Sequence, residues 1–429
     1  MKFKKILSFF SNRFFTFLSK KYKADYKVQK LVAQKVFYVI LYAHFFRKNV
    51  SLRGLSQDFN DILLQKKMFG DQQYQTIHYS SFHYRLDNIN PDYYKSLYEK
   101  ALNKISLLCT KKGQKTNFLT FDSTTVSLSS KVLSLGFKES GNSRSNSVKF
   151  TVGFDGWLPQ SVDLYTEAKY GNENNALGET ILNTDIAAGR IILFDRGISN
   201  RALFDKFTDR DNLFITRLNS GYKIDVTNSL HSFKKKNDKP GDLIITKEQQ
   251  GYLYSRASKK TKHTYRVIHC KSNKRNQKSE KVQSKARRMF YGTKKHANKT
   301  KDEIVEEIQG EELIFVTNIP AEQMDAQEIA ACYKKRWDIE KFFRFIKQEL
   351  NFKHFLNRSE KGILSLVYIR MILAILILFY KLKNNLKGYK PVKNAIRLEI
   401  MRERSMLPES KKCKQIRAGP IPVQEKCNF

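Results

Sequence analysis

Residues 331–350 read ACYKKRWDIEKFFRFIKQEL, and the absence of glycine and proline from this stretch predicts a helix. At about 100° per residue, four polar side chains fall within about 60° of one another: Tyr333, Arg336, Glu340 and Lys347. Arg344 lies on the same stripe. The remaining surface carries Trp337, Phe342 and Phe343, which we expect to be buried.

Two interpretations of this polar stripe are open. It could be a solvent-exposed face in which Arg336 and Glu340 form an ion pair between adjacent turns, worth a few tenths of a kcal/mol. Alternatively, a carboxylate among cations suits a site that holds a metal ion and also grips phosphate. The rest of the chain favours the second interpretation.

The charge of the chain indicates a polyanionic partner. Its 429 residues include 79 Lys and Arg against 41 Asp and Glu, a formal net charge of +38. The cations are spread along the chain, and its apolar content is sufficient for a folded core. Nucleic acid is therefore a better candidate partner than a membrane surface.

The first part of the chain, residues 1–110, has the pattern of a helical region. The N-terminal 23 residues predict an amphipathic helix and not a signal peptide, because cations interrupt the apolar run. Further helices are expected within 28–46, after a Ser51 cap, and over Tyr79–Leu86. Short helices in a basic chain suit DNA binding of the helix-turn-helix type, and a helical bundle used only for packing is the alternative.

The hydrophobic period changes after this region. Residues 111–218 contain β-branched and aromatic runs with helical segments between them, which predicts an α/β layer. Residues 219–318 read as a β-rich insertion. Within it, residues 256–301 hold 17 Lys or Arg and one acid, Glu280, which is typical of a solvated loop or of a surface facing DNA phosphates.

The last third of the chain returns to helices. Residues 319–385 contain the polar stripe, and the apolar run Leu364–Tyr380 is short for a membrane span and includes Arg370. We therefore expect that run to be a buried core helix. Residues 386–429 are basic, without a convincing periodic core, and are expected to form a tail.

The cysteines predict no disulfide framework and no zinc site. There are five, at positions 109, 270, 332, 413 and 427, and no pair has the spacing of zinc ligands. His78 with His83, or His263, His269 and Cys270, would make an improbable alternative site. The pattern indicates reduced thiols and a cytoplasmic protein.

Two aspartates follow apolar runs in the α/β region. Asp122 lies in LTFDST and Asp195 in IILFDRG, where we expect strands to carry them to an edge of the sheet. Either residue alone would more often be a cap or a turn former. Together with Glu340, they make a set of hard oxygen ligands suited to Mg²⁺ in a strongly basic protein.

These motifs resemble those of DDE transposases of the insertion-sequence-four group. The group's mark, Tyr-x2-Arg-x3-Glu-x6-Lys, is matched by Tyr333, Arg336, Glu340 and Lys347. FDST around Asp122, VKFTVGFDGWLP and the long block FDRGISNRALFDKFTDRDNLFITRL containing Asp195 also resemble the family. The resemblance covers about 115–220 and 310–385.

The resemblance implies a fold, a cofactor and roles for the site residues. It implies a mixed sheet of the ribonuclease H type flanked by helices, interrupted by the β-rich insertion and preceded by the helical region. Asp122, Asp195 and Glu340 would form the catalytic triad that binds two Mg²⁺ ions, for which Mn²⁺ can substitute. Tyr333, Arg336 and Lys347 would hold DNA phosphates, and Arg344 joins them on the same stripe.

It also implies an activity and partners. The protein would cut DNA at the ends of an insertion sequence and transfer the 3′-hydroxyls into target DNA, in the bacterial cytoplasm on the nucleoid. Its partners would be terminal inverted repeats, target DNA and a second copy of itself, with no membrane. Some relatives form a hairpin with the help of a tryptophan in the insertion, but Trp157 and Trp337 both lie outside it. A metal-dependent nuclease of the same fold and an inactive DNA-binding remnant are the alternatives.

Overall fold

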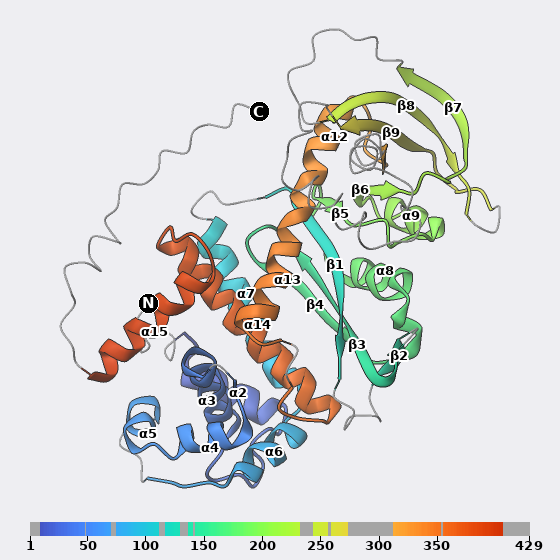
Figure 1. Ribbon diagram of the computed structural model, residues 1–429. Helices are drawn as coiled ribbons and strands as arrows, with labels where there is room; N and C mark the ends of the chain where they lie inside the picture. The colour runs from blue at the N-terminus through green and yellow to red at the C-terminus, as the bar shows by residue number, and fades with distance from the viewer. Residues whose placement is uncertain are drawn as a thin grey trace, which may run out of the picture.

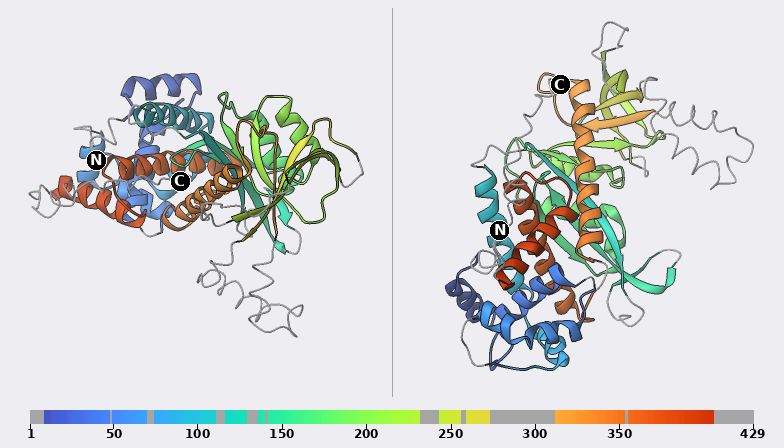
Figure 2. Two further views of the ribbon diagram at one scale, coloured as in Figure 1. Left: turned by 90° about the horizontal axis from the view of Figure 1, so that it is seen from above. Right: turned by 60° about the vertical axis from the view of Figure 1, so that its left-hand side comes forward.

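The computed structural model describes residues 9–47, 49–69, 74–110, 116–128, 136–139, 142–231, 243–255, 259–272, 312–352 and 355–405. A layer of helices lies beside a sheet that crosses the molecule, and Figures 1 and 2 show the two from three directions. The predicted basic stretch 256–301 falls largely outside the described residues, as do positions 413 and 427 and the last 24 residues.

The N-terminal region is helical, as predicted. Ser11 and Ser51 cap the first and third of its described helices with side-chain hydrogen bonds to backbone N–H groups. The helices are α2 (Asn12–Lys21), α3 (Ala33–Phe46), α4 (Leu52–Phe59), α5 (Ile62–Phe69), α6 (Tyr79–Asn88) and α7 (Asp92–Thr110).

The central sheet has the expected ribonuclease H-like topology. Its five core strands lie in the order β4-β3-β1-β5-β6, with the first three antiparallel and β5 and β6 parallel to β1. A short strand, β2 (Phe137–Glu139), pairs with the first part of β3, on the side of β3 that faces away from β1. The core strands are β1 (Phe118–Ser127), β3 (Asn142–Phe154), β4 (Pro159–Tyr165), β5 (Ile191–Leu193) and β6 (Leu213–Leu218). The fold prediction is confirmed.

The β-rich insertion extends this sheet and is not separate from it. β10 pairs with β6, and the insertion strands follow it in the order β9-β8-β7, all antiparallel. Its strands are β7 (Ile224–His231), β8 (Leu243–Leu253), β9 (Tyr265–Ser272) and β10 (Leu313–Thr317). The insertion is therefore continuous with the core sheet through backbone hydrogen bonds.

Helices cover both faces of the sheet. α8 (Glu173–Asn183), which follows the short η1 (Ala168–Gly171), and α9 (Arg201–Thr208) pack on one face. On the opposite face run α12 (Ala326–Tyr333), the single 3₁₀ turn η4 (Lys334–Arg336) and α13 (Trp337–Glu349). In Figure 1, α13 and α8 stand on either side of β1.

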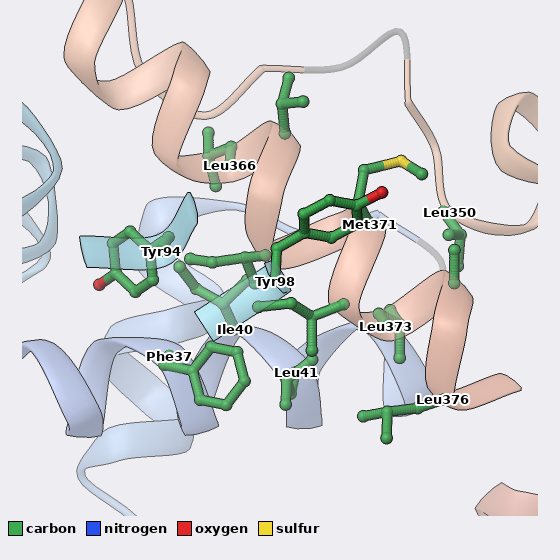
Figure 3. Packing of buried hydrophobic residues seen from close by; sticks show 14 of the residues in the cluster. Phe37, Ile40, Leu41, Tyr94, Tyr98, Leu350, Leu366, Met371, Leu373 and Leu376 are labelled. Carbon is green, nitrogen blue, oxygen red and sulfur yellow. The ribbon is translucent and has the colours of Figure 1, made fainter. Parts of the chain in front are cut away.

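The apolar run near the C-terminus is the central helix of the core, α14 (Glu360–Lys383). It is long and apolar enough to cross a membrane, but 83% of its most apolar window is buried inside the molecule. α3, α6 and α7 pack against it, and Figure 3 shows side chains of α3 and α7 beside those of α14. The prediction of a buried core helix is confirmed.

A buried hydrogen bond joins two polar side chains within this core. Arg370 of α14 is buried, and its Nε donates to Nε2 of His44 on α3 at 3.3 Å. Burial and the adjacent Arg370 charge lower the pKa of His44 to about 3, so the imidazole stays neutral and can accept this hydrogen bond. The pair ties the N-terminal helices to α14.

The C-terminal segment differs from its prediction as a tail without a core. Helix α15 (Lys390–Ser405) packs against α3 and α14 and buries Val392, Ile396 and Ile400. These apolar residues are spaced by four, but each is followed directly by a polar, charged or flexible residue, Lys393, Arg397 and Met401, in a segment rich in cations. The N-terminal helices, α13, α14 and α15 thus share one hydrophobic cluster.

Candidate active site

The register of the sheet sets the two aspartates side by side. β1 and β5 are parallel, with Thr120 paired to Leu193, and the same register carried two residues further places Asp122 beside Asp195. Adjacent strands are about 4.8 Å apart, and neighbours in register point to the same face. Asp195 follows its strand, as predicted, whereas Asp122 lies inside β1, which runs to Ser127.

Arg336 joins the helical stripe to the first aspartate. Its Nη2 donates to Oε1 of Glu340 at 2.5 Å, and its Nη1 lies 3.9 Å from Oδ2 of Asp122. The ion pair between adjacent turns exists, but Arg336 is buried and faces the sheet. The interpretation of the stripe as a merely solvent-exposed face is therefore wrong.

Tyr333 reaches the second aspartate. Its hydroxyl is within 3.3 Å of both the Phe194 carbonyl oxygen and Oδ1 of Asp195, and it donates to these acceptors. Burial and the Asp195 charge raise the pKa of Tyr333, which keeps the phenol protonated. Burial alone would lower the pKa of Arg336, but Tyr333, Asp195 and Glu340 hold it above its usual value.

The other two cations of the stripe are placed differently. Lys347 donates from Nζ to Oγ1 of Thr124 on β1 at 2.5 Å, on the same face as Asp122. Arg344 is exposed to solvent and does not join these contacts. Phe342 and Phe343 are buried as predicted, but Trp337 is 53% exposed. Trp337 and Phe342 are about 140° apart around a helix, so one helix cannot press both onto the same surface.

Two further charged residues lie at this site and were not found from the sequence. Arg217 on β6 comes beside Asp195 when the β5–β6 register is extended by two residues. Glu173, at the start of α8, accepts a hydrogen bond from Ser123 Oγ at 2.6 Å. Locally, Arg217 resembles any strand residue and Glu173 any acid in a first helical turn, so the sequence carries no signal for either.

The acids of this site repel one another. Burial raises the pKa of Asp122 to about 6, and the charges of Glu173 and Asp195 add to the rise. The N–H of Ser123 and the Arg336 guanidinium act in the opposite direction without cancelling it. A buried carboxylate surrounded by other carboxylates is stabilised when a cation binds.

This pKa predicts how stability depends on pH without metal. Folding disfavours the ionised form of Asp122, which lowers the free energy of unfolding. This loss of stability is absent below about pH 3.8 and complete above about pH 6. Asp122→Asn lacks this penalty, and we expect the variant to unfold at a higher temperature than wild type at pH 7. The difference should shrink as the pH falls through this window in chelator-treated protein. A difference independent of pH would contradict the assignment.

The carboxylates Asp122, Asp195 and Glu340 are chemically suited to bind a divalent cation. In this structure the Arg336 guanidinium is their positive neighbour. Among the described residues, no group of three or more His, Cys, Asp or Glu side chains is gathered at metal-binding geometry. Between Glu340 and Asp122 lies the Arg336 guanidinium. Asp122 and Glu340 contact this guanidinium and the charge of Asp195 also acts on it, so the three carboxylates offer the oxygen ligands that Mg²⁺ takes.

A comparison with protein families identifies the family of this chain. A family model described as "Transposase DDE domain" matches residues 113–377. No curated protein matches the chain. A solved structure, a cryo-EM piggyBac transposase synaptic complex with hairpin DNA, is 9% identical with a TM-score of 0.38. The match covers 90% of this chain and 75% of the piggyBac chain, and at this TM-score it supports no conclusion about function.

Proposed function

Since this chain belongs to the transposase DDE domain family, we propose that it is the transposase of an insertion sequence of the insertion-sequence-four group. It would cut DNA at the ends of its element and join the released 3′-hydroxyls to target DNA by a cut-and-paste route. We propose that it acts as a homodimer that pairs two ends, in the cytoplasm on nucleoid DNA.

One observation carries this proposal. Asp195 lies two residues past the end of β5, the parallel neighbour of the strand that carries Asp122, and Arg336 contacts both Asp122 and Glu340. Residues 122, 195 and 340 come from two strands and a helix far apart in the chain. Phosphodiester chemistry with two metal ions needs carboxylates of this kind, and the contacts of Arg336 with Asp122 and Glu340 support their use in one site.

The carboxylates would hold the metal ions. Asp122, Asp195 and Glu340 would bind two Mg²⁺ ions, or Mn²⁺ in their place, which activate the attacking oxygen and stabilise the leaving oxygen of the phosphodiester. Arg336 would exchange its carboxylate partners for a DNA phosphate, which its planar fork fits. Lys347 would act as a second cation on the same face, and exposed Arg344 would contact the DNA backbone further out.

The charge of the chain supports DNA as the partner. A net charge of +38 favours association with a polyanion and supplies the sequence-independent part of the affinity. The terminal repeats of the element and the target duplex would both bind through it.

The experiment that tests this function is a strand-transfer assay. Full-length protein is incubated with Mg²⁺, a labelled duplex carrying the terminal repeat that flanks the gene, and a circular target. Products joined covalently to the target are expected. If the ends are cleaved but never joined to the target, the protein is a metal-dependent nuclease. If it binds the repeat specifically but does not cleave it, the protein is an inactive remnant.

Arg336→Ala should weaken complexes with transposon ends by about 10- to 100-fold. Removing a charge-assisted contact costs about 1.5–3 kcal/mol, and about 1.4 kcal/mol is a factor of ten. Binding to unrelated duplex DNA should change little. Gel-shift titrations with both DNAs measure this, with exposed Arg358→Ala as the control. Equal loss on both DNAs would rule out the phosphate contact.

A further inference from the structure

A cavity of about 550 Å³ lies beside the acids but contains none of them. It opens where the start of β1, the β3–β4 turn, the η4–α13 junction and the α14–α15 connection meet. This volume is within the range of small-ligand sites, about 300–1,000 Å³. The residues that matter below are Thr120, Trp157, Lys335, Lys341, Lys381 and Tyr389.

Two aromatic rings in this cavity are held in place. Tyr389 stacks on Phe345 of α13, with centroids 4.2 Å apart and planes at 18°. Trp157 sits in the β3–β4 turn, where its backbone N–H donates to Oδ1 of Asp155 at 2.8 Å, and its side chain packs against the large hydrophobic cluster. Trp157 and Tyr389 each remain partly exposed. Fixed, half-exposed aromatic rings are suited to stacking against a flat ring such as a nucleobase.

The cavity also has an excess of positive charge. Three lysines line it, and the carboxylates beside them are already engaged. Asp155 accepts hydrogen bonds within its own turn, and Asp338 pairs with Lys341 at 3.0 Å.

Lys381 is a partly buried cation of this cavity. Its Nζ lies 4.9 Å from the centre of the Tyr389 ring, and it makes no ion pair within the described residues. Burial and the Lys341 charge lower the pKa of Lys381, and the charge of Asp338 opposes this without cancelling it. An anion bound here would relieve that cost, since opposite charge favours the ionised form.

The cavity is placed to receive a strand that passes the acids. Thr120 lies two residues before Asp122 on the same face of β1, on the order of 7 Å away. Lys335 directly precedes Arg336 in the chain. A ligand here would therefore lie next to the site of cleavage and outside it.

We propose that this cavity binds one nucleotide unit, with the base against Trp157 and Tyr389 and its phosphate held by Lys335 and Lys381. The chemistry fits a free nucleotide or one unpaired nucleotide of a DNA strand. In the second case the inference rests on the proposed function, because the strand would be the one being cut.

The test uses the fluorescence of Trp157. The chain has two tryptophans, so full-length Trp337→Phe leaves Trp157 as the only one. This protein is titrated with deoxyadenosine monophosphate, with a short single-stranded oligonucleotide and with a blunt duplex. Saturable quenching by the mononucleotide identifies a free-nucleotide site, and quenching only by the single strand identifies a strand nucleotide. Quenching by neither, or by the duplex alone, would overturn the proposal.

A matched pair of variants locates the phosphate. Lys381→Gln should weaken the quenching titration at least about tenfold, as loss of a charge-assisted contact does. Lys383→Gln, two residues further along α14 and exposed, should leave it unchanged. Equal loss in both variants, with unfolding temperatures unaltered, would show general charge attraction and overturn the site.

The result of the fluorescence titration can be distinguished from the result of the strand-transfer assay. Asp122→Asn is titrated in the same way, because loss of cleavage should not alter the cavity. Quenching without any cleavage by wild type would reject the transposase function and keep the nucleotide site. Strand transfer without quenching would reject only the nucleotide site.

Discussion

Asp122→Asn should lower DNA cleavage by at least about a thousandfold. The substitution keeps the shape of the side chain but removes the charge that faces Arg336 and neighbours Asp195. Stabilisation of transition-state charge by a bound metal is worth several kcal/mol, and each 1.36 kcal/mol is a factor of ten in rate. Nicking of an end-labelled terminal-repeat duplex with Mg²⁺ or Mn²⁺ measures the loss.

The control is Asp185→Asn, which changes an exposed aspartate between α8 and β5 and should cleave as wild type does. Both variants should bind the duplex equally well. Because Asp122→Asn is also expected to be more stable at pH 7, loss of activity cannot be ascribed to unfolding. Cleavage within tenfold of wild type would remove Asp122 from the catalytic set.

Glu248→Ala should lower the free energy of unfolding by about 3–5 kcal/mol. Glu248 on β8 accepts two hydrogen bonds from Arg266 on β9, and both side chains are buried. Arg266 also donates to the carbonyl oxygens of Ile319 and Met324, just before α12. Removing the acid leaves a buried charge without its partner, which costs about this much.

Chemical denaturation of the metal-free protein measures this change. Glu248→Leu with Arg266→Met should lose much less stability than Glu248→Ala, since two apolar side chains can replace a buried pair at little cost. The matched control is Lys260→Ala, which breaks an exposed pair with Asp225 and should change stability by less than about 1 kcal/mol. A similar loss in the Glu248 variant and the control would show that the buried pair does not anchor the insertion.

Much of the fold could be predicted because its signals are local. The strand segments around Asp122 and before Asp195 are runs of apolar and β-branched residues, and the helix cap at Ser51 is a short motif. The buried nature of α14 followed from its length and from Arg370. α15 could not be predicted, since its three buried residues have meaning only against α3 and α14.

The sequence by itself determined which side chains could do chemistry. Helical spacing fixes Tyr333, Arg336 and Glu340 relative to one another, and the apolar runs before the two aspartates place each on or just after a strand. These relations extend over at most a few turns or one strand, so propensity and periodicity suffice to read them.

Only the tertiary structure decided how these groups meet. The parallel pairing of β1 with β5 brings the chain segments of Asp122 and Asp195 next to each other, and packing of α13 on the sheet places Arg336 between Asp122 and Glu340. The pairing of β5 with β6 brought in Arg217, the position of α8 brought in Glu173, and the packing of α13 and α14 shaped the lysine-lined cavity. Register and helix docking depend on contacts between residues distant in the chain, where a shift of one residue would turn every strand side chain to the opposite face.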